Sequence, residues 1–402
     1  MLLRQGHVEN MPHGRVGSDL LMLRFSLVWL AGVLTPLVSL HADSISLTTP
    51  TEYQVVQRET LTGGTIAVRG TLTGCSAKPP EISARLLSGE QPAEWQTLSA
   101  TVKNEKFEAT LKAPAGGWYR LEVRATQESQ VLAETAINHI GVGEVFVVAG
   151  QSNSANHGEE KQETKTERVS SFDGIRWQLA NDPQPGASGN GGSFLPPLGD
   201  AMVKRFDVPV GFVSCGIGAT SVREWLPKGS RFPNPPTIES RVQKLPNGEW
   251  QSQGEAFEMF IARTKPLGPK GFRAVLWHQG ESDANQRDTT RTLTGPLYRE
   301  SLTQVIRESR REIGWDAPWF VAQVSYHVPG DEASPEIRAA QASLWTDGIA
   351  LEGPDSDSLM SEWRDASGKG VHFSGPGLRE HGRLWEEKVG AWLERQLNDS
   401  GG

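Results

Sequence analysis

The chain has 402 residues, of which 48 are acidic and 40 basic, so its formal net charge is −8. This length exceeds what one hydrophobic core usually organises, which excludes a single small module and predicts two or three domains. The acidic balance and the lack of a dense Lys/Arg stripe argue against a nucleic-acid partner.

Residues 1–42 resemble a secretory signal peptide. Arg24 precedes an apolar stretch at residues 25–40, and the small residue Ala42 would lie at the cleavage point. Met22 would make a better start for such a signal than the first methionine. The apolar stretch is shorter than a typical membrane span, and no later run reaches that length. We therefore expect a secreted or periplasmic protein without a stable membrane anchor.

Residues 43–140 carry the alternating pattern of short β-strands. Apolar and polar residues alternate at residues 65–70, 82–87, 107–111 and 118–124, and glycine or proline pairs separate these runs. The pattern predicts a small all-β sandwich domain. No catalytic cluster is evident in it.

Residues 141–402 follow a different pattern, in which buried strands alternate with helices. An unbroken apolar run at residues 145–149 predicts a buried strand, and the mainly apolar stretches at residues 208–214, 274–278 and 319–325 are further candidates. Apolar residues at helical spacing predict helices between them, and a long amphipathic helix ends the chain. This alternation predicts an α/β fold, with a parallel sheet between two layers of helices.

Two long excursions, at residues 159–193 and 227–254, interrupt this α/β pattern. Both are rich in glycine, proline, asparagine and charged residues. Loops of this length inside a compact domain are commonly functional.

Three polar segments follow three of the predicted strands, at the edge where an open parallel sheet binds its ligand. The first is GQSNS at residues 150–154, where Ser152 would stand at a helix entrance whose N–H groups can stabilise an oxyanion. The alternative is that Ser152 or Ser154 only caps that helix. The second is the glycine turn GIGATSVREW at residues 216–225, which can bring backbone N–H groups close to an oxyanion.

The third segment is WHQGES at residues 277–282. Gln279 can donate its amide to the same oxyanion, and Glu281 is either an organiser of the site or a local cap. A nucleophilic serine also needs a base, and His372 lies on a turn just before the terminal helix. The other candidate bases are His157, His278 and His327.

Cysteine and metal chemistry are not indicated. The two cysteines, Cys75 and Cys215, cannot form a disulfide framework, and no CxxC or His–Cys cluster is present. We expect neither a metal nor a cofactor.

The set GQSNS, GIGATSVREW, WHQGES and VHFS resembles the SGNH hydrolase superfamily, in its sialate O-acetylesterase-like branch, which overlaps the family-6 carbohydrate esterases. The resemblance covers residues 143–397. It implies a three-layer, flavodoxin-like fold for residues 141–402 and a serine-dependent acetylesterase that acts on acetylated oligosaccharides or polysaccharides. It further implies Ser152 as nucleophile, His372 as base, and an oxyanion hole formed by the N–H groups of Ser152 and Gly218 with the Gln279 amide.

The sequence departs from this pattern at the triad acid. The family usually has an aspartate three residues before its histidine, and Lys369 occupies that position here. We predict Asp365 as the acid, with Asp355, Asp357 and Glu281 as alternatives, and a dyad without an acid is a further option. The missing motif also leaves open a second function, a catalytically inactive glycan-binding protein on the same fold. The sequence does not indicate an oligomeric state.

Overall fold

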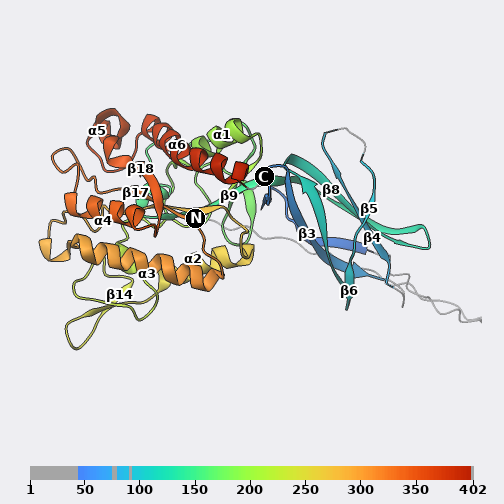
Figure 1. Cartoon of the computed structure of the whole chain (residues 1–402), viewed down its shortest axis with the longest axis horizontal. Helices are drawn as coiled ribbons and strands as arrows, with labels where there is room; N and C mark the ends of the chain where they lie inside the picture. The colour runs from blue at the N-terminus through green and yellow to red at the C-terminus, as the bar shows by residue number, and fades with distance from the viewer. Residues whose placement is uncertain (1–43, 75–78, 90–92, 400–402) are drawn as a thin grey trace, which may run out of the picture. The chain divides into compact units, whose positions relative to one another are not determined.

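A computed structural model of the chain describes residues 44–74, 79–89 and 93–399. The predicted signal peptide lies outside these residues. The described chain has a mixed α/β architecture with several sheets (Figure 1).

The part of the chain before residue 142 is built from β-strands. Its strands are β1 (Ser44–Thr49), β2 (Val55–Gln57), β3 (Gly63–Thr73), β4 (Glu81–Leu87), β5 (Gln96–Thr97), β6 (Thr101–Lys103), β7 (Lys106–Pro114), β8 (Gly116–Gln127) and the first half of β9 (Gln130–Gly150). One sheet has the order β1-β3-β7-β6, and β4, β5, β8 and β9 pair antiparallel in another. Side chains of β7 alternate strictly between exposed and buried, as expected of a strand with one face on a core.

Strand β9 is 21 residues long and belongs to both halves of the structure. Its first half pairs antiparallel with β8, and from Glu144 onward it pairs parallel with its neighbours in the second half. Glu144 is fully buried and accepts hydrogen bonds from Arg58 (2.6 Å) and Arg273 (2.7 Å). Because a buried carboxylate requires such partners, this charge cluster ties the β-rich segment to the start of the parallel sheet.

The main sheet has the strand order β11-β10-β12-β9-β16-β17-β18. Its further strands are β10 (Val169–Phe172), β11 (Trp177–Leu179), β12 (Val210–Ser214), β16 (Ala274–His278), β17 (Trp319–Gln323) and β18 (Leu351–Asp355). All neighbouring pairs from β10 to β18 are parallel, and β11 is antiparallel. The chain runs from β9 to β10 and β12 on one side and then to β16, β17 and β18 on the other. The carboxyl end of β9 is therefore a topological switch point, where open α/β sheets bind ligands.

Helices cover both faces of this sheet. They are α1 (Leu195–Phe206), α2 (Glu255–Thr264), α3 (Gly295–Ile313), α4 (Pro335–Thr346), the short α5 (Asp365–Gly368) and α6 (Gly375–Asp399). On β9, Val145, Val147 and Ala149 share a core with α2, α3 and α4, whereas Phe146 and Val148 share a core with α1 and α6. Figure 1 shows α1 and α6 on one side of the strands and α2, α3 and α4 on the other.

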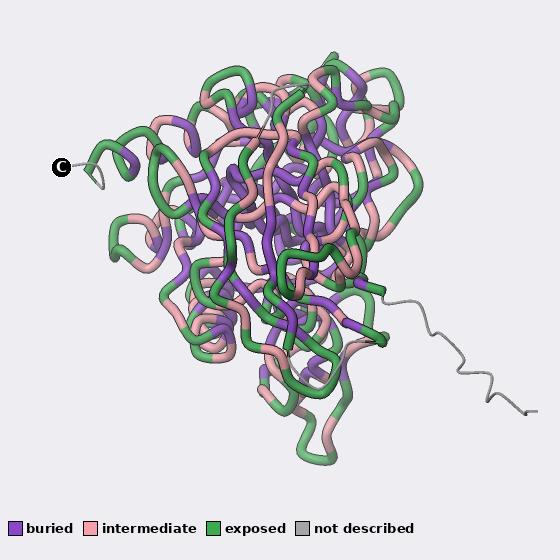
Figure 2. The backbone as a smooth tube through the Cα atoms, turned by 90° about the vertical axis from the view of Figure 1, so that its right-hand side faces the viewer, coloured by how far each residue is buried: buried purple, intermediate pink, exposed green. Residues whose placement is uncertain are grey.

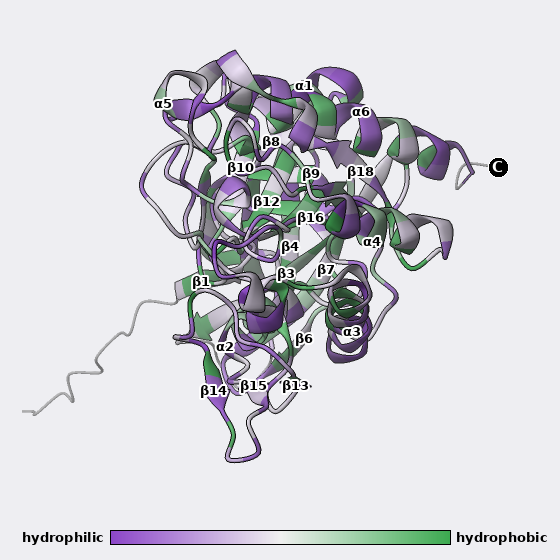
Figure 3. Ribbon diagram, turned by 90° about the vertical axis from the view of Figure 1, so that its left-hand side faces the viewer, coloured by the Kyte–Doolittle hydropathy of each residue, from purple (hydrophilic) through white to green (hydrophobic). Residues whose placement is uncertain are grey.

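Strands β10, β12 and β16 are buried at every residue, and Figure 2 shows buried segments gathered in the middle of the molecule. Figure 3 shows the strands as hydrophobic, while the helices turn hydrophilic faces outward. This is why the strands appear in the sequence as mainly apolar runs. No helix in the described part of the chain is both long and apolar enough to span a membrane.

The two excursions are ordered. The first contains β10 and β11, and the second folds into a three-stranded sheet of β13 (Arg231–Phe232), β15 (Trp250–Ser252) and β14 (Val242–Lys244). Single 3-10 turns complete the chain: η1 (Ser152–Ser154), η2 (Val222–Trp225), η3 (Lys265–Leu267), η4 (Thr289–Arg291), η5 (Ser356–Ser358) and η6 (Ser361–Trp363).

Candidate active site

Ser152 lies on a tight turn at the carboxyl end of β9. Gly150, at φ +130°, makes the turn possible, because an added Cβ would overlap the His278 carbonyl of neighbouring β16. The helix expected at Ser152 is only the 3-10 turn η1, in which Ser154 Oγ donates to the Gln151 carbonyl (2.8 Å). Within the described residues, neither the backbone N–H nor the Oγ of Ser152 has a protein hydrogen-bond partner. Both groups are therefore free to meet a substrate.

Asn153 fixes this turn to two other segments. Its Nδ2 donates to Glu281 Oε1 (3.0 Å) and to the Val371 carbonyl (3.1 Å). One buried amide thus joins the Ser152 turn, the WHQGES segment and the residue before His372. These hydrogen bonds fix the position of the Ser152 turn relative to the segment that carries His372.

His372 lies beside Asp365. The carboxylate Oδ2 is 3.5 Å from His372 Nδ1, and Oδ1 accepts the His372 backbone N–H (3.1 Å). Burial lowers the pKa of His372, and the neighbouring Asp365 charge opposes this by raising it. The imidazole is therefore largely neutral near pH 7, as a general base must be.

The loop that carries this pair is shaped for close approach. Ala366 and Ser367 have left-handed backbone angles inside α5, and a Cβ at Gly370 would overlap the Asp365 carboxylate. Arg364, which is buried, donates to the carbonyls of Leu359, Val371 and Ser356. The tight loop lets an acid seven residues upstream in sequence reach the histidine.

Ser152 and His372 line one cavity of about 940 Å³. Its wall includes Gly218, Glu281 and residues of both excursions, among them Ser188, Thr237, Ile238 and Arg241. The hydrogen bonds of the described residues include none between Ser152 Oγ and His372, and such bonds are often long or absent before substrate binds.

The other candidate bases are less suited. His278 is buried against Ser356, and burial lowers its pKa to about 3. His327 uses both ring nitrogens, one with Asp331 (2.7 Å) and one with the Glu281 carbonyl (2.6 Å). His157 lines the cavity, stacks on His372 with ring centroids 5.4 Å apart, and contacts Ser188 rather than a carboxylate.

The alternative acids are placed elsewhere. Asp355 pairs with Arg338 (2.7 Å), and Asp357 accepts the backbone N–H groups of Ser325 and Tyr326. Glu281 lines the cavity, but it contacts Asn153 rather than His372, and burial raises its pKa to about 7. Among the candidate acids, Asp365 has the carboxylate that the structure brings to His372.

Of the two other predicted oxyanion donors, Gly218 lines the cavity and Gln279 does not. Gly218 lines the cavity, and its N–H donates to Ser188 Oγ (2.6 Å). The Gln279 amide nitrogen is committed to Asp283 Oδ2 (2.7 Å), the Thr220 carbonyl (3.1 Å) and Gln151 Oε1 (3.3 Å). Gln279 is fully buried and is not among the cavity-lining residues, so in this structure it braces the turns instead of facing the cavity.

Comparison with known families gives one match. The family described as "Carbohydrate esterase, sialic acid-specific acetylesterase" matches residues 142–389, which include Ser152, Asp365 and His372. The chain belongs to this carbohydrate esterase family.

Two solved structures are similar to the chain of this carbohydrate esterase. A carbohydrate acetylesterase from Xanthomonas citri is 17% identical, with 85% of this chain and 74% of that chain covered and a TM-score of 0.48. A carbohydrate esterase family 2 enzyme with a carbohydrate-binding domain, from Corynascus thermopiles (Myceliophthora fergusii), is 10% identical, with coverage of 87% and 99% and a TM-score of 0.35. A comparison with curated proteins found no match.

The sequence analysis of this carbohydrate esterase did not identify three residues whose side chains hydrogen-bond the segments of the site to one another. Asn153 lies inside the recognised GQSNS motif, and Arg364 directly precedes Asp365, so only their positions hinted at a role. Asp283 is fully buried and accepts hydrogen bonds from Ser221, Val222, Arg223 and Gln279. Nothing in the pattern distinguished it from a surface aspartate.

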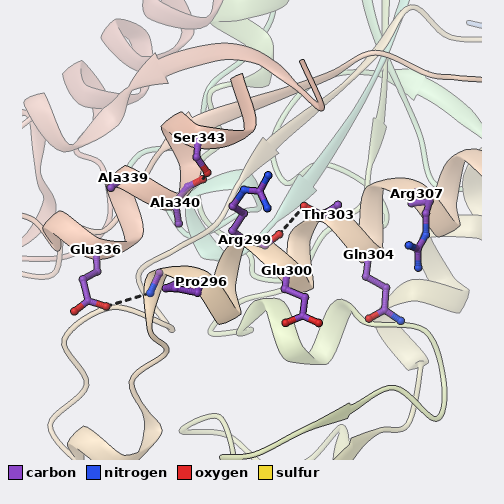
Figure 4. Close-up of a pocket in the computed structure, with 11 residues that line it drawn as sticks. Pro296, Arg299, Glu300, Thr303, Gln304, Arg307, Glu336, Ala339, Ala340 and Ser343 are labelled. Atoms are coloured by element: carbon purple, nitrogen blue, oxygen red, sulfur yellow. Dashed lines mark hydrogen bonds between the residues drawn. The ribbon is translucent and has the colours of Figure 1, made fainter. Parts of the chain in front are cut away.

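A second groove of the esterase, of about 760 Å³, lies between α3 and α4 (Figure 4). Its wall is formed by long side chains on the two helices, including Arg299, Glu300, Gln304 and Glu336. It shares no residue with the Ser152 cavity. The described residues contain no cluster of three or more His, Cys, Asp or Glu that could hold a metal ion, and Cys215 is a buried free thiol.

Proposed function

We propose that this protein is a serine-dependent carbohydrate O-acetylesterase. The observation that carries the proposal is the placement of Ser152 and His372 on one cavity, with Asp365 Oδ2 3.5 Å from His372 Nδ1. Family membership supports an acetylated carbohydrate as the substrate class.

The proposed reaction uses these groups in order. Ser152 Oγ attacks the acetyl carbonyl while His372 accepts its proton, and the free N–H of Ser152 faces the developing oxyanion. The tetrahedral intermediate collapses, the bond to the sugar oxygen breaks, and His372 returns the proton to that oxygen. Water then attacks the acetyl-enzyme by the same route and releases acetate. Asp365 holds the imidazole in the productive tautomer and stabilises its charged form.

The architecture supports the finer assignment of the fold. We assign residues 141–402 to a three-layer SGNH-type domain and residues 43–140 to a β-sandwich domain, because helices cover both faces of the parallel sheet and a separate core fills the β-rich segment. With residues 1–42 as a signal peptide, we propose a secreted or periplasmic enzyme.

The test is acetate release from a panel of acetylated glycans and an aryl acetate by the protein from Asp43 onward. Ser152→Ala is expected to abolish release, and Ser46→Ala, an exposed serine on β1, is expected to leave it unchanged. Thermal unfolding of each variant verifies that it is folded. A folded wild type that releases no acetate from any substrate would overturn the esterase and favour the inactive glycan-binding protein.

A further inference from the structure

Ser188, in the first excursion, is clamped between two of the turns that form the site. Its backbone N–H donates to the Gly216 carbonyl (3.0 Å), and its carbonyl accepts the N–H of Asn156 (2.9 Å). Asn156 Nδ2 also donates to the Gln184 and Ala187 carbonyls just upstream. The excursion is therefore fixed to the nucleophile turn and to the glycine turn, which gives Ser188 a defined position in the cavity wall.

The hydroxyl of Ser188 has two neighbours in that wall. Its Oγ accepts the Gly218 N–H (2.6 Å) and lies 3.1 Å from His157 Nε2. A Cβ at Gly218 would crowd His157 Nε2, so a glycine is needed for the three groups to meet. The backbone N–H that the family pattern would aim at the oxyanion is directed at a side chain instead.

The hydrogen-bonding capacity of a hydroxyl then limits where its proton can point. A serine hydroxyl has one proton to donate and two lone pairs to accept with. Gly218 N–H occupies one lone pair of the Ser188 oxygen. The proposal requires that His157 carries its ring proton on Nε2, so that this N–H occupies the other lone pair. Burial and the neighbouring His372 both lower the pKa of His157, which favours the neutral ring. In that tautomer the Ser188 proton is left for a third acceptor, and the cavity that Ser188 and Ser152 both line is where a substrate can supply one.

We propose that the Ser188 hydroxyl, held by Gly218 N–H and His157, donates the second hydrogen bond to the oxyanion, in place of Gly218 itself. The inference rests on the proposed esterase function. When Ser152 Oγ bonds to the acetyl carbon, the carbonyl π electrons move to oxygen, and the Ser188 O–H meets that charge beside the Ser152 N–H. Ser188 keeps its proton throughout, since the transferred proton moves between Ser152, His372 and the leaving sugar oxygen.

The experiment measures kcat and KM for acetate release by the full chain, four single variants and one double variant. Ser188→Ala is expected to lower kcat by roughly 10²- to 10³-fold with KM within about threefold, as for loss of one oxyanion donor. Ser188→Thr keeps the hydroxyl and is expected to stay within about tenfold of the wild type. Asn190→Ala, an exposed neighbour on the same loop, is the matched control and is expected to match the wild type.

His157→Phe tests whether the histidine acts through Ser188. It keeps an aromatic ring against His372, and we expect kcat to fall by about tenfold. Combined with Ser188→Ala, it should cause no further loss, because the group that it orients is already gone. Additive losses would show that His157 acts independently.

The results separate the two proposals. An inactive wild type overturns both. An active wild type with an unchanged or raised kcat in Ser188→Ala overturns only the role of Ser188, since it would show that the released Gly218 N–H stabilises the oxyanion directly. Equal losses in Ser188→Ala and Ser188→Thr would also overturn it, because the hydroxyl would then not be the group that matters.

Discussion

Asp365→Asn tests the assignment of the triad acid, because asparagine keeps the shape of the side chain and removes its charge. The carboxylate lies 3.5 Å from His372 Nδ1, and the two side chains are 22% and 26% exposed. Unit charges at this distance interact by about 5 kcal/mol at an effective dielectric constant of about 20. Partial exposure screens this, so we expect the transition state to lose about 2–4 kcal/mol, which lowers kcat/KM roughly 30- to 1,000-fold.

The pH profile of this variant gives an independent readout. Asp365 raises the pKa of His372 against the effect of burial, so its removal should lower that pKa further. A base is active when unprotonated, so the acid limb of kcat/KM should move to lower pH while the plateau falls. A reduction of the plateau without this shift would indicate a purely structural effect.

The assay is the initial rate of aryl acetate hydrolysis between pH 4 and 9, with Lys369→Ala as the control. Lys369 occupies the position where the family pattern has its acid, and we expect its removal to leave the rate and the pH profile unchanged. If Asp365→Asn stays within threefold of the wild type with the same profile, Asp365 is not the acid and the mechanism operates as a Ser–His dyad.

Three further predictions follow from the same loop and its supports. In the wild type, the acid limb of kcat/KM should lie below pH 6.5, because burial lowers the pKa of His372; an acid limb above pH 7 would contradict this. Glu281 has a folded-state pKa of about 7, above its ordinary value of 4.5, so the fold loses stability as pH rises from about 4.5 to 7. Denaturant titration should show that the free energy of unfolding of Glu281→Gln rises by roughly 3 kcal/mol relative to that of the wild type as pH increases across this window. A difference between the two unfolding free energies that does not change with pH would argue against a buried titrating carboxyl. Asn153→Ala removes the amide that donates to Glu281 and to the Val371 carbonyl, so it should destabilise the protein by about 1–3 kcal/mol and lower kcat. Unfolding curves that overlay those of the wild type would show that these two hydrogen bonds do not stabilise the fold.

The sequence predicted the parts of the fold whose patterns are regular. The strands expected at residues 208–214, 274–278 and 319–325 lie within a few residues of β12, β16 and β17, and helices alternate with them as expected. The run at residues 145–149 matches only the carboxyl end of β9, which begins at Gln130. Strand β10 was missed because its sequence, VSSF, places two buried serines in the sheet, and β18 was missed because LEGPD resembles a turn. Gly353 of β18 is required because a Cβ there would crowd the backbone of β17. Such reasons exist only in three dimensions.

The candidate site was predictable where motif and topology coincide. Ser152, Gly218 and His372 follow strand ends or precede a helix, and the structure brings all three to one cavity. The contacts of Gln279 and Ser188 could not be read from the sequence, because they depend on how two turns and a long excursion pack against each other. The same is true of Asp365, whose approach to His372 depends on left-handed residues in the loop.

The continuity of β9 bears on how the amino-terminal part of this protein can be altered. Modules joined by a flexible linker can be deleted, exchanged or lengthened with little effect on the catalytic unit. Here no linker separates the two parts, because one strand runs from its pairing with β8 to Gly150, two residues before Ser152. A truncation at Gly143 would remove Arg58, leaving Glu144 with Arg273 as its only remaining cationic partner in the described cluster. It would also remove the pairing with β8 from the strand that leads to Ser152. Any shortened chain that keeps β2 and Arg58 also keeps strands β3 to β8, and we expect disturbance of these strands to reach the Ser152 turn through β9.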